Sequence, residues 1–483
     1  MHHSALSTDF YELTMAQGYF LEKNNPTVVF EMFYRTNPFE GGYVLFAGLH
    51  DLIDRLESFT FDSEDIAYLE RLGTFTPEFL EYLSTYRFMG DIYAVEEGTV
   101  VFPGEPLLRV HTTMIDASLI EGMLLNTLNF QSLIATKAAR VSLAAKRGSV
   151  FEFGLRRAQG PNGALSASRA AFIGGCQSTS HTLAGKIFDI PVSGTMAHAW
   201  VMAFDSELQA FRSYAELYPG STTLLIDTYD TLGSGIDNAI IVGLEEKAKG
   251  NRIGVRIDSG DLSYLPRVIR KRLDDAGLED AYIVVSNDLT EEIIQTLIHD
   301  GVPIDSWGIG THLVTGGSQA SLNGVYKLAA KQLSDGTFQP TMKVSNSFEK
   351  TTDPGIKQLY RFYDGEGGAI ADLVTCVDEE ISVGKDYIFY HPFAETDFFK
   401  MEKDRYARIE PLLKLVVEHG LRVGEKPCLR LLQAKAAKSL ATFHKSYLRQ
   451  INPHIYKVSL SEKLKALKIE ILVTHRKKAA KIN

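Results

Sequence analysis

Hydrophobic residues between about position 150 and position 345 fall in short runs, each ending at a small or charged residue. Successive runs begin about 30 residues apart, the size of a unit in which a strand, a loop and a helix follow one another. Continuous apolar runs are typical of parallel strands that are buried on both faces. We therefore predict an α/β fold with a parallel sheet, of the kind that closes into a (β/α) barrel. The runs are 149–154, 189–194, 222–228, 253–261, 281–288 and 305–311.

The parts on either side have other patterns. Residues 1 to about 135 mix helical and strand patterns, and apolar and polar residues alternate over 90–113 around a Pro-Gly turn, which predicts a hairpin or a meander. After about 345 the chain is polar, until strand-like alternation returns up to 384–393. From 429 on the composition is helical and basic, which is more often a solvated face than a nucleic-acid surface. We expect three domains, at 1–135, 136–345 and 346–483.

Composition and charge narrow the class of partner. The 483 residues are 45% hydrophobic and 23% charged, as in soluble globular proteins. A net charge of -10 argues against nucleic acid or an anionic membrane as the main partner and favours a small molecule. No apolar run has the length of a signal peptide or a membrane span. Cys176, Cys376 and Cys428 lack the spacing of zinc or dithiol sites, so we expect no metal cage and a cytoplasmic location.

Candidate chemical groups stand at the ends of the predicted strands. A barrel places its active site at the carboxyl ends of its strands. Some of these groups could serve only as turn formers, because Asp and Gly are common there. A whole row of polar groups on one face of an apolar sheet nevertheless favours a site. The row is Glu152, Arg156, Thr195, His198, Asp227, Asp230, Arg256, Asp258, Asp261, Asn287, Asp288, Gly308 and Gly310.

One histidine stands out in this row. The stretch IPVSGTMAHAWVMAF at 190–204 predicts a strand, a tight turn and a helix, with His198 in or near the first helical turn. Backbone N–H groups in a first turn lack partners and favour anions, which suits a phosphate approaching the ring. The simpler alternative for a single histidine is a partly buried ring that hydrogen-bonds a loop carbonyl.

The stretch GVRIDSGDL at 254–262 carries two carboxylates and an arginine. Asp258 and Asp261 could hold ribose hydroxyls or Mg²⁺, which prefers one or two carboxylates plus phosphate oxygens. The alternative is a turn that caps the next helix. Arg256 alternates with apolar neighbours, so its guanidinium points into the barrel mouth if those neighbours face the outer helices. A buried guanidinium needs an anion, and a small carboxylate or a phosphate would satisfy it.

Two further stretches could contact a phosphate. The loop DSWGIGTHLVTGG at 305–317 joins a strand end to two glycine clusters, and glycine lets backbone N–H groups approach an anion closely. Such glycine-rich turns also occur without a ligand. Arg156 and Arg157, just after the strand at 149–152, could bind a polyanion.

Two aromatic residues could stack on a planar ligand. Phe153 directly follows the first strand of the predicted sheet. The stretch at 8–12 predicts a helix that begins with Asp9 as N-cap and Glu12 completing a capping box, which leaves Tyr11 as an aromatic residue in the first turn. Taken singly, each of these aromatic residues is more often part of a core.

Seven stretches together resemble the nicotinate phosphoribosyltransferase family, in the family's own order. They are TDFYELTMAQGYF, EFGLRRAQG, SASRAAFIGG, SGTMAHAW, LIDTYDT, GVRIDSGDL and GIGTHLVTGG. The resemblance runs from about residue 6 to 345, and more loosely to about 470. It implies an irregular (β/α) barrel with an N-terminal sandwich-like α+β domain and a smaller C-terminal domain. It also implies a homodimer whose active site borrows residues from the partner subunit.

The resemblance implies a reaction as well. Nicotinate and phosphoribosyl pyrophosphate would give nicotinate mononucleotide and pyrophosphate, the first step of NAD salvage from nicotinate, with Mg²⁺ and with ATP as a coupled co-substrate. The family assigns a transiently phosphorylated histidine to the position of His198. In that interpretation a neutral ring nitrogen attacks the γ-phosphate of ATP, and phosphorylation favours a closed form.

The resemblance also assigns roles to the other candidates. It gives Tyr11, Thr195 and Arg256 to nicotinate and Thr311 to the phosphoribosyl group. Within that frame Phe153 and Tyr11, from opposite subunits, could sandwich the pyridine ring. We add Arg156, Arg157, Asp261 and Gly310 as candidate contacts of the phosphoribosyl group and its phosphates. Asp258 becomes a catalytic ribose or Mg²⁺ contact. Relatives that use nicotinamide have an acidic residue near the pocket, whereas residues 177–185 offer Ser180 and no carboxylate, which favours nicotinate. His181 stands where the family more often has asparagine.

Other interpretations stay open at this point. A nicotinamide or quinolinate phosphoribosyltransferase would share most phosphoribosyl contacts, although the second carboxylate of quinolinate demands more basic residues than we can assign. A barrel aldolase could use Lys327 as a Schiff base. A nucleotide sensor on the same barrel would carry out no turnover.

Overall fold

The computed structural model describes residues 5–146, 148–344, 351–394 and 396–480. The chain divides into two compact units. The first, here called the mixed-sheet unit, comprises Met1–Leu133, Ser321–Pro427 and Ala434–Asn483. The second, the parallel-sheet unit, comprises Ile134–Ala320 and Cys428–Gln433. The structure thus groups the expected first and last domains in one unit. The division into three domains stays a prediction, and its boundary at 345 lies outside the described residues.

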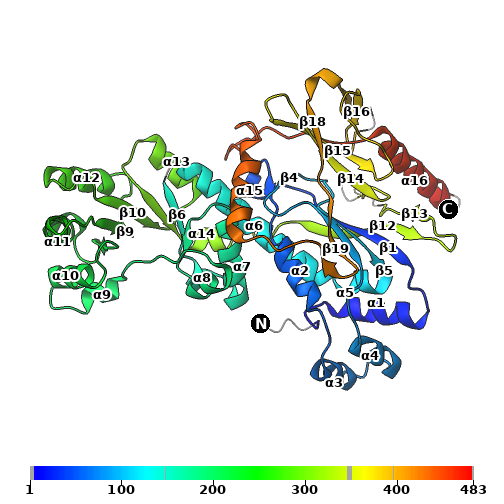
Figure 1. The fold of residues 1–483 in the computed structure, drawn as a ribbon, viewed down its shortest axis with the longest axis horizontal. Coiled ribbons are helices and arrows are strands. Elements are labelled where there is room, and N and C mark those ends of the chain that lie inside the picture. Colours follow the sequence, from blue (N-terminus) through cyan, green and yellow to red (C-terminus); the bar gives the residue numbers. More distant parts are fainter. Residues whose placement is uncertain (1–4, 147, 345–350, 395, 481–483) are drawn as a thin grey trace. The chain divides into compact units, whose positions relative to one another are not determined.

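The parallel-sheet unit contains the predicted parallel sheet. Its six strands are all parallel, in the order β7-β6-β11-β10-β9-β8, and Figure 1 shows β6, β9 and β10 with helices around them. Five strands fall within the apolar runs, so the pattern located them correctly. Their bounds are β6 (Ser149–Glu152), β8 (Thr223–Leu225), β9 (Gly254–Ile257), β10 (Tyr282–Asn287) and β11 (Ser306–Ile309), with β7 at Ser178–Thr179.

The sixth expected strand is much shorter than predicted. Within the run at 189–194 only Val192 pairs, in one parallel bridge to Thr179 of β7. A proline at 191 has no N–H to donate, which limits how far a ladder can extend. As described, the sheet is open, with β8 paired on one side only. An α/β fold is therefore established, whereas closure into a barrel is not.

Helices connect these strands, and polar residues cap several of them. Thr290 accepts a hydrogen bond from the N–H of Ile293 at the start of α13, and Ser206 does the same for Gln209 in α10. The helices are α7 (Gly160–Ile173), α8 (Thr182–Phe188), α9 (His198–Met202), α10 (Glu207–Leu217), α11 (Ile236–Ala248), α12 (Leu265–Asp275), α13 (Glu291–His299) and α14 (Thr311–Val314), with turns η2 (Leu155–Arg157) and η3 (Thr231–Gly235).

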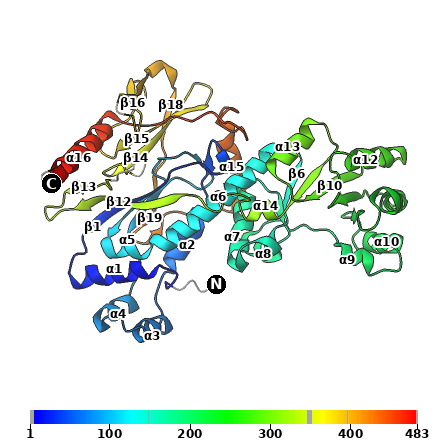
Figure 2. The ribbon, with the colours of Figure 1, turned by 180° about the vertical axis from the view of Figure 1, so that it is seen from behind.

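The mixed-sheet unit is built on three sheets, parts of which are labelled in Figure 2. The first is β13 (Phe338–Pro340), β12 (Gly324–Gln332), β1 (Thr27–Tyr34), β5 (Leu108–Thr113), β3 (Asp91–Ala94), β19 (Lys414–Glu418) and β20 (Leu421–Arg422). The second is β17 (Phe398–Met401), β16 (Tyr387–Tyr390), β21 (Val458–Leu460), β15 (Ala369–Cys376), β14 (Lys357–Tyr363) and β18 (Arg408–Pro411). The third pairs β2 (Val44–Leu45) with β4 (Val100–Val101).

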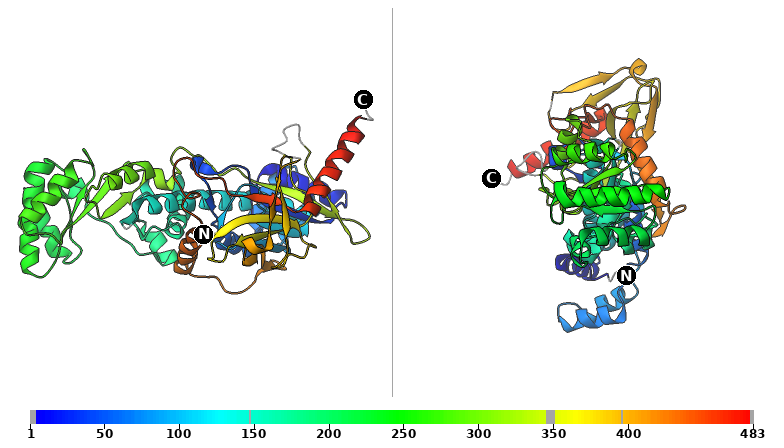
Figure 3. Two further views of the ribbon diagram at one scale, coloured as in Figure 1. Left: turned by 90° about the horizontal axis from the view of Figure 1, so that it is seen from above. Right: turned by 90° about the vertical axis from the view of Figure 1, so that its left-hand side faces the viewer.

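The structure tests the predictions made for residues 90–113 and for the basic C-terminal segment. Within 90–113, β3 and β5 pair antiparallel as a meander requires, while β4 leaves to pair with β2. The basic tail is not continuously helical, because β21 interrupts it between α15 (Leu429–Ala441) and α16 (Glu462–Ala480), which leads to the C terminus (Figure 3). The β21 residues are mostly buried and pair with β15 and β16, so pairing in the sheet outweighs helical composition.

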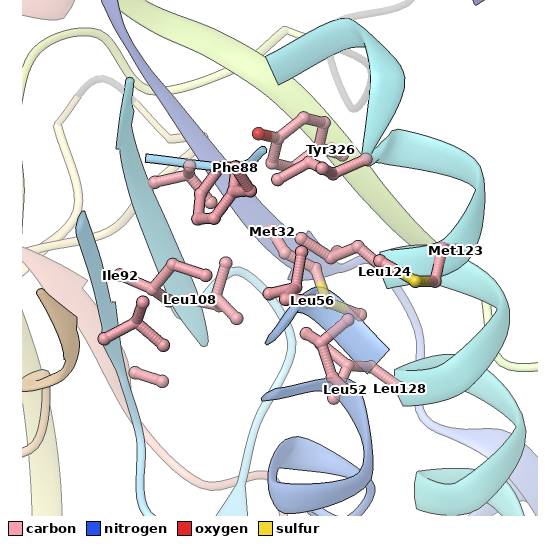
Figure 4. Close-up of a cluster of buried hydrophobic side chains, with 14 of the residues drawn as sticks. Met32, Leu52, Leu56, Phe88, Ile92, Leu108, Met123, Leu124, Leu128 and Tyr326 are labelled. Atoms are coloured by element: carbon pink, nitrogen blue, oxygen red, sulfur yellow. The ribbon is translucent and has the colours of Figure 1, made fainter. Parts of the chain in front are cut away.

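The core of the mixed-sheet unit packs helices against its first sheet. Figure 4 shows Met32, Leu52, Leu56, Leu108 and Leu124 among the buried side chains of this cluster. Each buried side chain of this size stabilises the fold by about 1.5–3 kcal/mol. The helices are α1 (Phe10–Leu21), α2 (Leu49–Glu57), α3 (Ser63–Arg71), α4 (Pro77–Ser84), α5 (Met114–Leu119) and α6 (Glu121–Ala145), with turns η1 (Pro38–Glu40) and η5 (Lys403–Arg405). Of the described helices, none has the length and apolar character that a membrane crossing requires.

Candidate active site

Arg256 of β9 links several predicted site residues at the carboxyl edge of the parallel sheet. Its Nη1 donates to Thr195 Oγ1 at 2.6 Å and to the carbonyl of Met196 at 3.0 Å. Its Nε donates to Ser286 Oγ at 2.9 Å, and its Nη2 lies 3.2 Å from Asp258 Oδ1. Val255 and Ile257, its neighbours in β9, are buried, so strand alternation turns Arg256 to the face of the site as predicted.

The guanidinium is almost fully engaged. A guanidinium carries five N–H donors in a fixed plane. Those of Nε and Nη1 have acceptors, and one of Nη2 faces Asp258, which leaves one Nη2 hydrogen for a ligand. With 13% of its side chain exposed, Arg256 is a preorganised cation that can still receive one anionic oxygen.

Asp258 is held in its ionised form by its neighbours. Burial raises the pKa of this carboxyl, but the hydrogen bond from Ser286, the charge of Arg256 and the nearby His198 outweigh burial, so the pKa is lowered. Ser286 Oγ accepts from Arg256 and donates to Asp258 Oδ1, so one hydroxyl bridges the two charges. Asp258 therefore offers a negative charge at neutral pH.

His198 is the first residue of α9, as the sequence predicted. Its Nδ1 lies 3.1 Å from Thr228 Oγ1, and its Nε2 lies 3.9 Å from Asp258 Oδ2. Both ring nitrogens thus have a polar neighbour, which restrains the ring. The side chain is 41% exposed, so a ligand can reach it from solvent. The alternative of a ring bonded to a loop carbonyl does not match this geometry.

Asp227, at the end of β8, supports the same site. Its Oδ2 accepts from the backbone N–H of Asp258 at 2.9 Å and from Ser259 Oγ at 2.7 Å. Its Oδ1 is buried and has no hydrogen-bond partner. A buried carboxylate oxygen without a partner is costly, so a cation or a donor that belongs to a ligand would find a ready acceptor here.

Phe153 directly follows β6 and lies against the neighbouring strand β11, where its N–H donates to the carbonyl of Ile309 at 2.8 Å. A Cβ atom on Gly308 would stand 2.6 Å from Cδ2 of the Phe153 ring, so glycine is required for the ring to sit there. A Cβ on Gly310 would stand 3.2 Å from the carbonyl oxygen of Phe153. The glycine-rich loop that leads into α14 at Thr311 therefore lies against Phe153.

His181 belongs to a buried polar network rather than to a free surface. Glu152 accepts hydrogen bonds from Thr179 Oγ1 and Ser168 Oγ, and Ser168 Oγ lies 3.3 Å from His181 Nδ1. The N–H of Ser180 donates to the carbonyl of Glu152 at 2.9 Å. The network fixes the backbone beside Phe153 and leaves the Ser180 hydroxyl as a candidate contact only.

The remaining candidates are not joined to this cluster by any contact that the described residues show. Asp261 accepts from the N–H groups of Ser263 and Tyr264, which is the turn that the sequence offered as its alternative. Arg156 and Arg157 are exposed on η2. Tyr11 belongs to the mixed-sheet unit, where it is half exposed in the first turn of α1, and Glu12 closes the predicted capping box.

Sequence reasoning missed two residues of the site, Ser286 and Thr228. Ser286 interrupts the apolar run at 281–288, two positions beyond the strand partner of Arg256, so the same alternation could have found it. Thr228 follows Asp227 directly, but nothing in the sequence distinguishes it. The rival lysine, Lys327, lies in β12 of the mixed-sheet unit, where its Nζ is 3.8 Å from Glu121 Oε1.

Comparisons with known proteins identify the family of the chain. Residues 6–129 match the nicotinate phosphoribosyltransferase N-terminal domain, and residues 356–468 match the C-terminal domain of the same family. The nicotinate phosphoribosyltransferase of Bacillus subtilis is 41% identical over 95% of this chain and 93% of its own. The human nicotinate phosphoribosyltransferase is 34% identical over 96% of this chain and 95% of its own.

Solved structures extend the comparison to the fold. The crystal structure of human nicotinic acid phosphoribosyltransferase superposes with a TM-score of 0.84 at 31% identity, covering 96% of this chain and 99% of that one. A nicotinate-nucleotide pyrophosphorylase from Pyrococcus furiosus, at 22% identity and a TM-score of 0.69, shares the fold. The extent and identity of these matches show that the chain belongs to the nicotinate phosphoribosyltransferase family.

Proposed function

We propose that this protein is an enzyme that transfers a phosphoribosyl group to nicotinate, as the names of its relatives state for them. The observation that carries the proposal is the cluster of Thr195, His198, Arg256 and Asp258, which places a cation, an ionised carboxylate and an accessible imidazole at one sheet edge. The substrates are nicotinate, phosphoribosyl pyrophosphate and ATP, and the products include nicotinate mononucleotide and pyrophosphate.

Arg256 is the residue we assign to the carboxylate of nicotinate. Its one remaining Nη2 hydrogen can donate to a carboxylate oxygen, and a hydrogen bond between two charged groups is stronger than one to a neutral amide. Neutral nicotinamide would leave the cation without that partner. Phe153, beside Gly308, provides a flat surface for the pyridine ring, with Thr195 and Ser180 as polar contacts.

His198 is the nucleophile toward ATP in this proposal. A lone pair of its neutral ring attacks the γ-phosphorus, the bond to the β-phosphate oxygen breaks, and ADP leaves with the bonding electrons. Thr228 and Asp258 lie on the two sides of the ring, so the ring loses little rotational freedom when it reacts. Hydrolysis of the phosphorylated ring later returns His198 and releases phosphate.

The transfer itself needs positioning and charge neutralisation. The pyridine nitrogen attacks the anomeric carbon while the bond to pyrophosphate breaks, through a state with oxocarbenium character. We assign the departing pyrophosphate to Arg156 and Arg157 and the phosphoribosyl group to Gly310, Thr311 and Asp261. The close approach of the glycine-rich loop to the backbone of Phe153 supports this assignment, because a phosphate bound by the loop would lie near a pyridine ring stacked on Phe153.

Mg²⁺ fits the carboxylates of this edge. Among the described residues no three His, Cys, Asp or Glu side chains gather as a metal cage. Mg²⁺ bound with phosphates needs only one or two carboxylates, and the partnerless Oδ1 of Asp227 meets that need together with Asp258. When bound, the ion would neutralise the charge of the pyrophosphate.

We extend the proposal to an irregular barrel. Hydrogen-bonded neighbours run in the order β8, β9, β10, β11, β6 and β7, and Val192 forms one bridge to β7. Pairing across the seam between Val192 and β8, which the described residues do not show, would close this order into a ring. His198 stands in the segment that crosses this seam.

We also propose a homodimer, with the N-terminal residues as a sandwich-like domain. Phe10 and Tyr11, each about half exposed at 52% and 50%, place two aromatic rings on the surface of the mixed-sheet unit. Tyr11 could then complete the nicotinate site of the partner subunit. The cytoplasm and the absence of a nucleic-acid partner stay predictions.

The test is product formation from nicotinate, and separately from nicotinamide, with phosphoribosyl pyrophosphate and Mg²⁺, with and without ATP. We expect turnover of nicotinate that ATP enhances. His198→Ala should abolish the ATP effect and retain some ATP-independent transfer. His299→Ala, an exposed histidine at the end of α13, is the matched control and should behave as the wild type.

Two results would contradict the proposal. Turnover of nicotinamide alone would show that Arg256 does not select a carboxylate. Turnover of neither base, before or after mutation, would favour a sensor.

A further inference from the structure

A cavity of about 740 Å³ lies within the mixed-sheet unit and has no part in the proposed reaction. Residues of β14, β18 and β19 and of the second half of α15 line it, and Figure 1 labels these four elements. Every lining residue belongs to that one unit. The cavity is therefore formed by the mixed-sheet unit itself.

The lining is positively charged in a chain whose net charge is -10. The lining has two carboxylates, Glu96 and Glu410, and five cations, of which Arg361 pairs with Asp372 outside the lining and four others remain. These four cations leave two positive charges in excess, the opposite sign to that of the whole protein. They are Arg408, Lys414, Lys435 and Lys438.

The carboxylates are shared rather than paired one to one. A single oxygen, Glu96 Oε2, accepts from Lys414 Nζ at 2.8 Å and from Lys435 Nζ at 2.7 Å. Glu410 pairs with Arg408 at 2.7 Å. Burial lowers the pKa of Lys435 although Glu96 acts against that shift, so one carboxylate does not fully compensate these ammonium groups.

The floor of the cavity adds no charge to this excess. Arg361 is 1% exposed and pairs with Asp372 at 2.6 Å. Burial and the neighbouring Asp372 raise the pKa of Glu105 well above its ordinary value, and Arg361 also lies 3.9 Å from this carboxyl. Arg361 thus has acidic partners of its own outside the lining, and the uncompensated charge lies on the other four cations.

The shape of the lining restricts the ligand further. The guanidinium of Arg408 lies 3.5 Å from the centre of the Tyr363 ring and covers that face. A nucleotide base would have to displace it to stack there. Compact oxyanions with two negative charges match both the charge excess and the lysine donors.

We propose that this cavity binds a phosphate group, as free inorganic phosphate or as the phosphate end of a nucleotide. Lys414, Lys435 and Lys438 donate to its oxygens, and Glu96 limits the affinity because it competes for two of the three ammonium groups. The site is separate from the residues assigned to phosphoribosyl pyrophosphate.

The experiment measures binding of radiolabelled inorganic phosphate to the full-length protein by equilibrium dialysis. Excess phosphoribosyl pyrophosphate is present to occupy the proposed catalytic site. Lys435→Met should weaken one phosphate site per chain by about tenfold, because a charge-assisted hydrogen bond is lost. Glu96→Gln should strengthen it, since the competing charge is gone and the shape is kept. Lys400→Met, on exposed β17, is the matched control and should bind as the wild type.

The opposite signs protect the test against misfolding, because a damaged protein does not gain affinity. A second arm adds ATP, and stronger displacement by ATP than by unlabelled phosphate would identify the nucleotide as the source. Equal binding by the wild type, Glu96→Gln and Lys435→Met would overturn the proposal.

Discussion

Ser286→Ala removes the hydroxyl that bridges the two charges of the site. Ser286 is 4% exposed, so water does not replace the lost group freely. Arg256 Nε loses its acceptor at 2.9 Å, and Asp258 loses the donor that lowers its pKa. Hydrogen bonds to charged groups contribute about 1.5–3 kcal/mol each. Asp258 is 31% exposed and keeps its direct contact with Arg256, so we expect a net loss of about 2 kcal/mol in the free energy of unfolding.

The loss in the free energy of unfolding depends on pH, and the ionisation of Asp258 determines its direction. Its folded pKa is lowered, so its contribution is present above the unfolded pKa and is lost as pH falls through the folded one. In the variant, burial acts without the bond from Ser286, and the folded pKa rises. The difference in stability between wild type and variant should be largest near neutral pH and should shrink as the pH falls below about 4, through the lowered folded pKa of Asp258 in the wild type.

Tryptophan fluorescence during urea unfolding is the suitable assay. The two tryptophans of the chain, Trp200 and Trp307, both belong to the parallel-sheet unit and report on the unit that contains Ser286. Ser221→Ala, at an exposed serine before β8, is the control. A midpoint for Ser286→Ala equal to that of the control would refute the reasoning. A difference that does not change with pH would refute the part assigned to Asp258.

Two further substitutions test other parts of the same unit. Gly308→Ala should displace the Phe153 ring, because the new Cβ would stand 2.6 Å from it. We expect the KM for nicotinate to rise by about tenfold while the fold stays intact. Initial-rate kinetics measure this, with Gly163→Ala as the control, because a Cβ at Gly163 has no neighbour closer than 3.9 Å. Glu291→Gln should cost about 3 kcal/mol, because Lys137 and Arg140 each lose a charge-assisted contact with this buried carboxylate. Burial raises the pKa of Glu291 but these two cations outweigh it and lower the pKa, so this contribution too is lost at low pH. Urea unfolding against Glu292→Gln, the exposed neighbour on α13, measures it, and equal midpoints would count against a stabilising triad.

Local rules read from the sequence were sufficient for several features. Apolar runs located five of the six parallel strands, because buried strands need continuous apolar residues whatever the rest of the chain does. The alternation around Arg256 set the face on which its side chain lies, and the turn before α9 set His198 at the start of a helix. Each of these depends on neighbours within a few positions.

Tertiary structure alone decided which residues meet. Ser286 and Thr228 become part of the site because parallel pairing places the ends of β8, β9 and β10 side by side, and residues 30 positions apart then share hydrogen bonds. Long-range pairing also makes β21 a strand within a tail of helical composition, and it pairs β12 with β1. Asp261, which looked like Asp258 in the sequence, turns to its own backbone because a nearby turn supplies two N–H donors. Sequence pattern records what one segment prefers, whereas the partners of a charged side chain depend on which distant segments pack beside it.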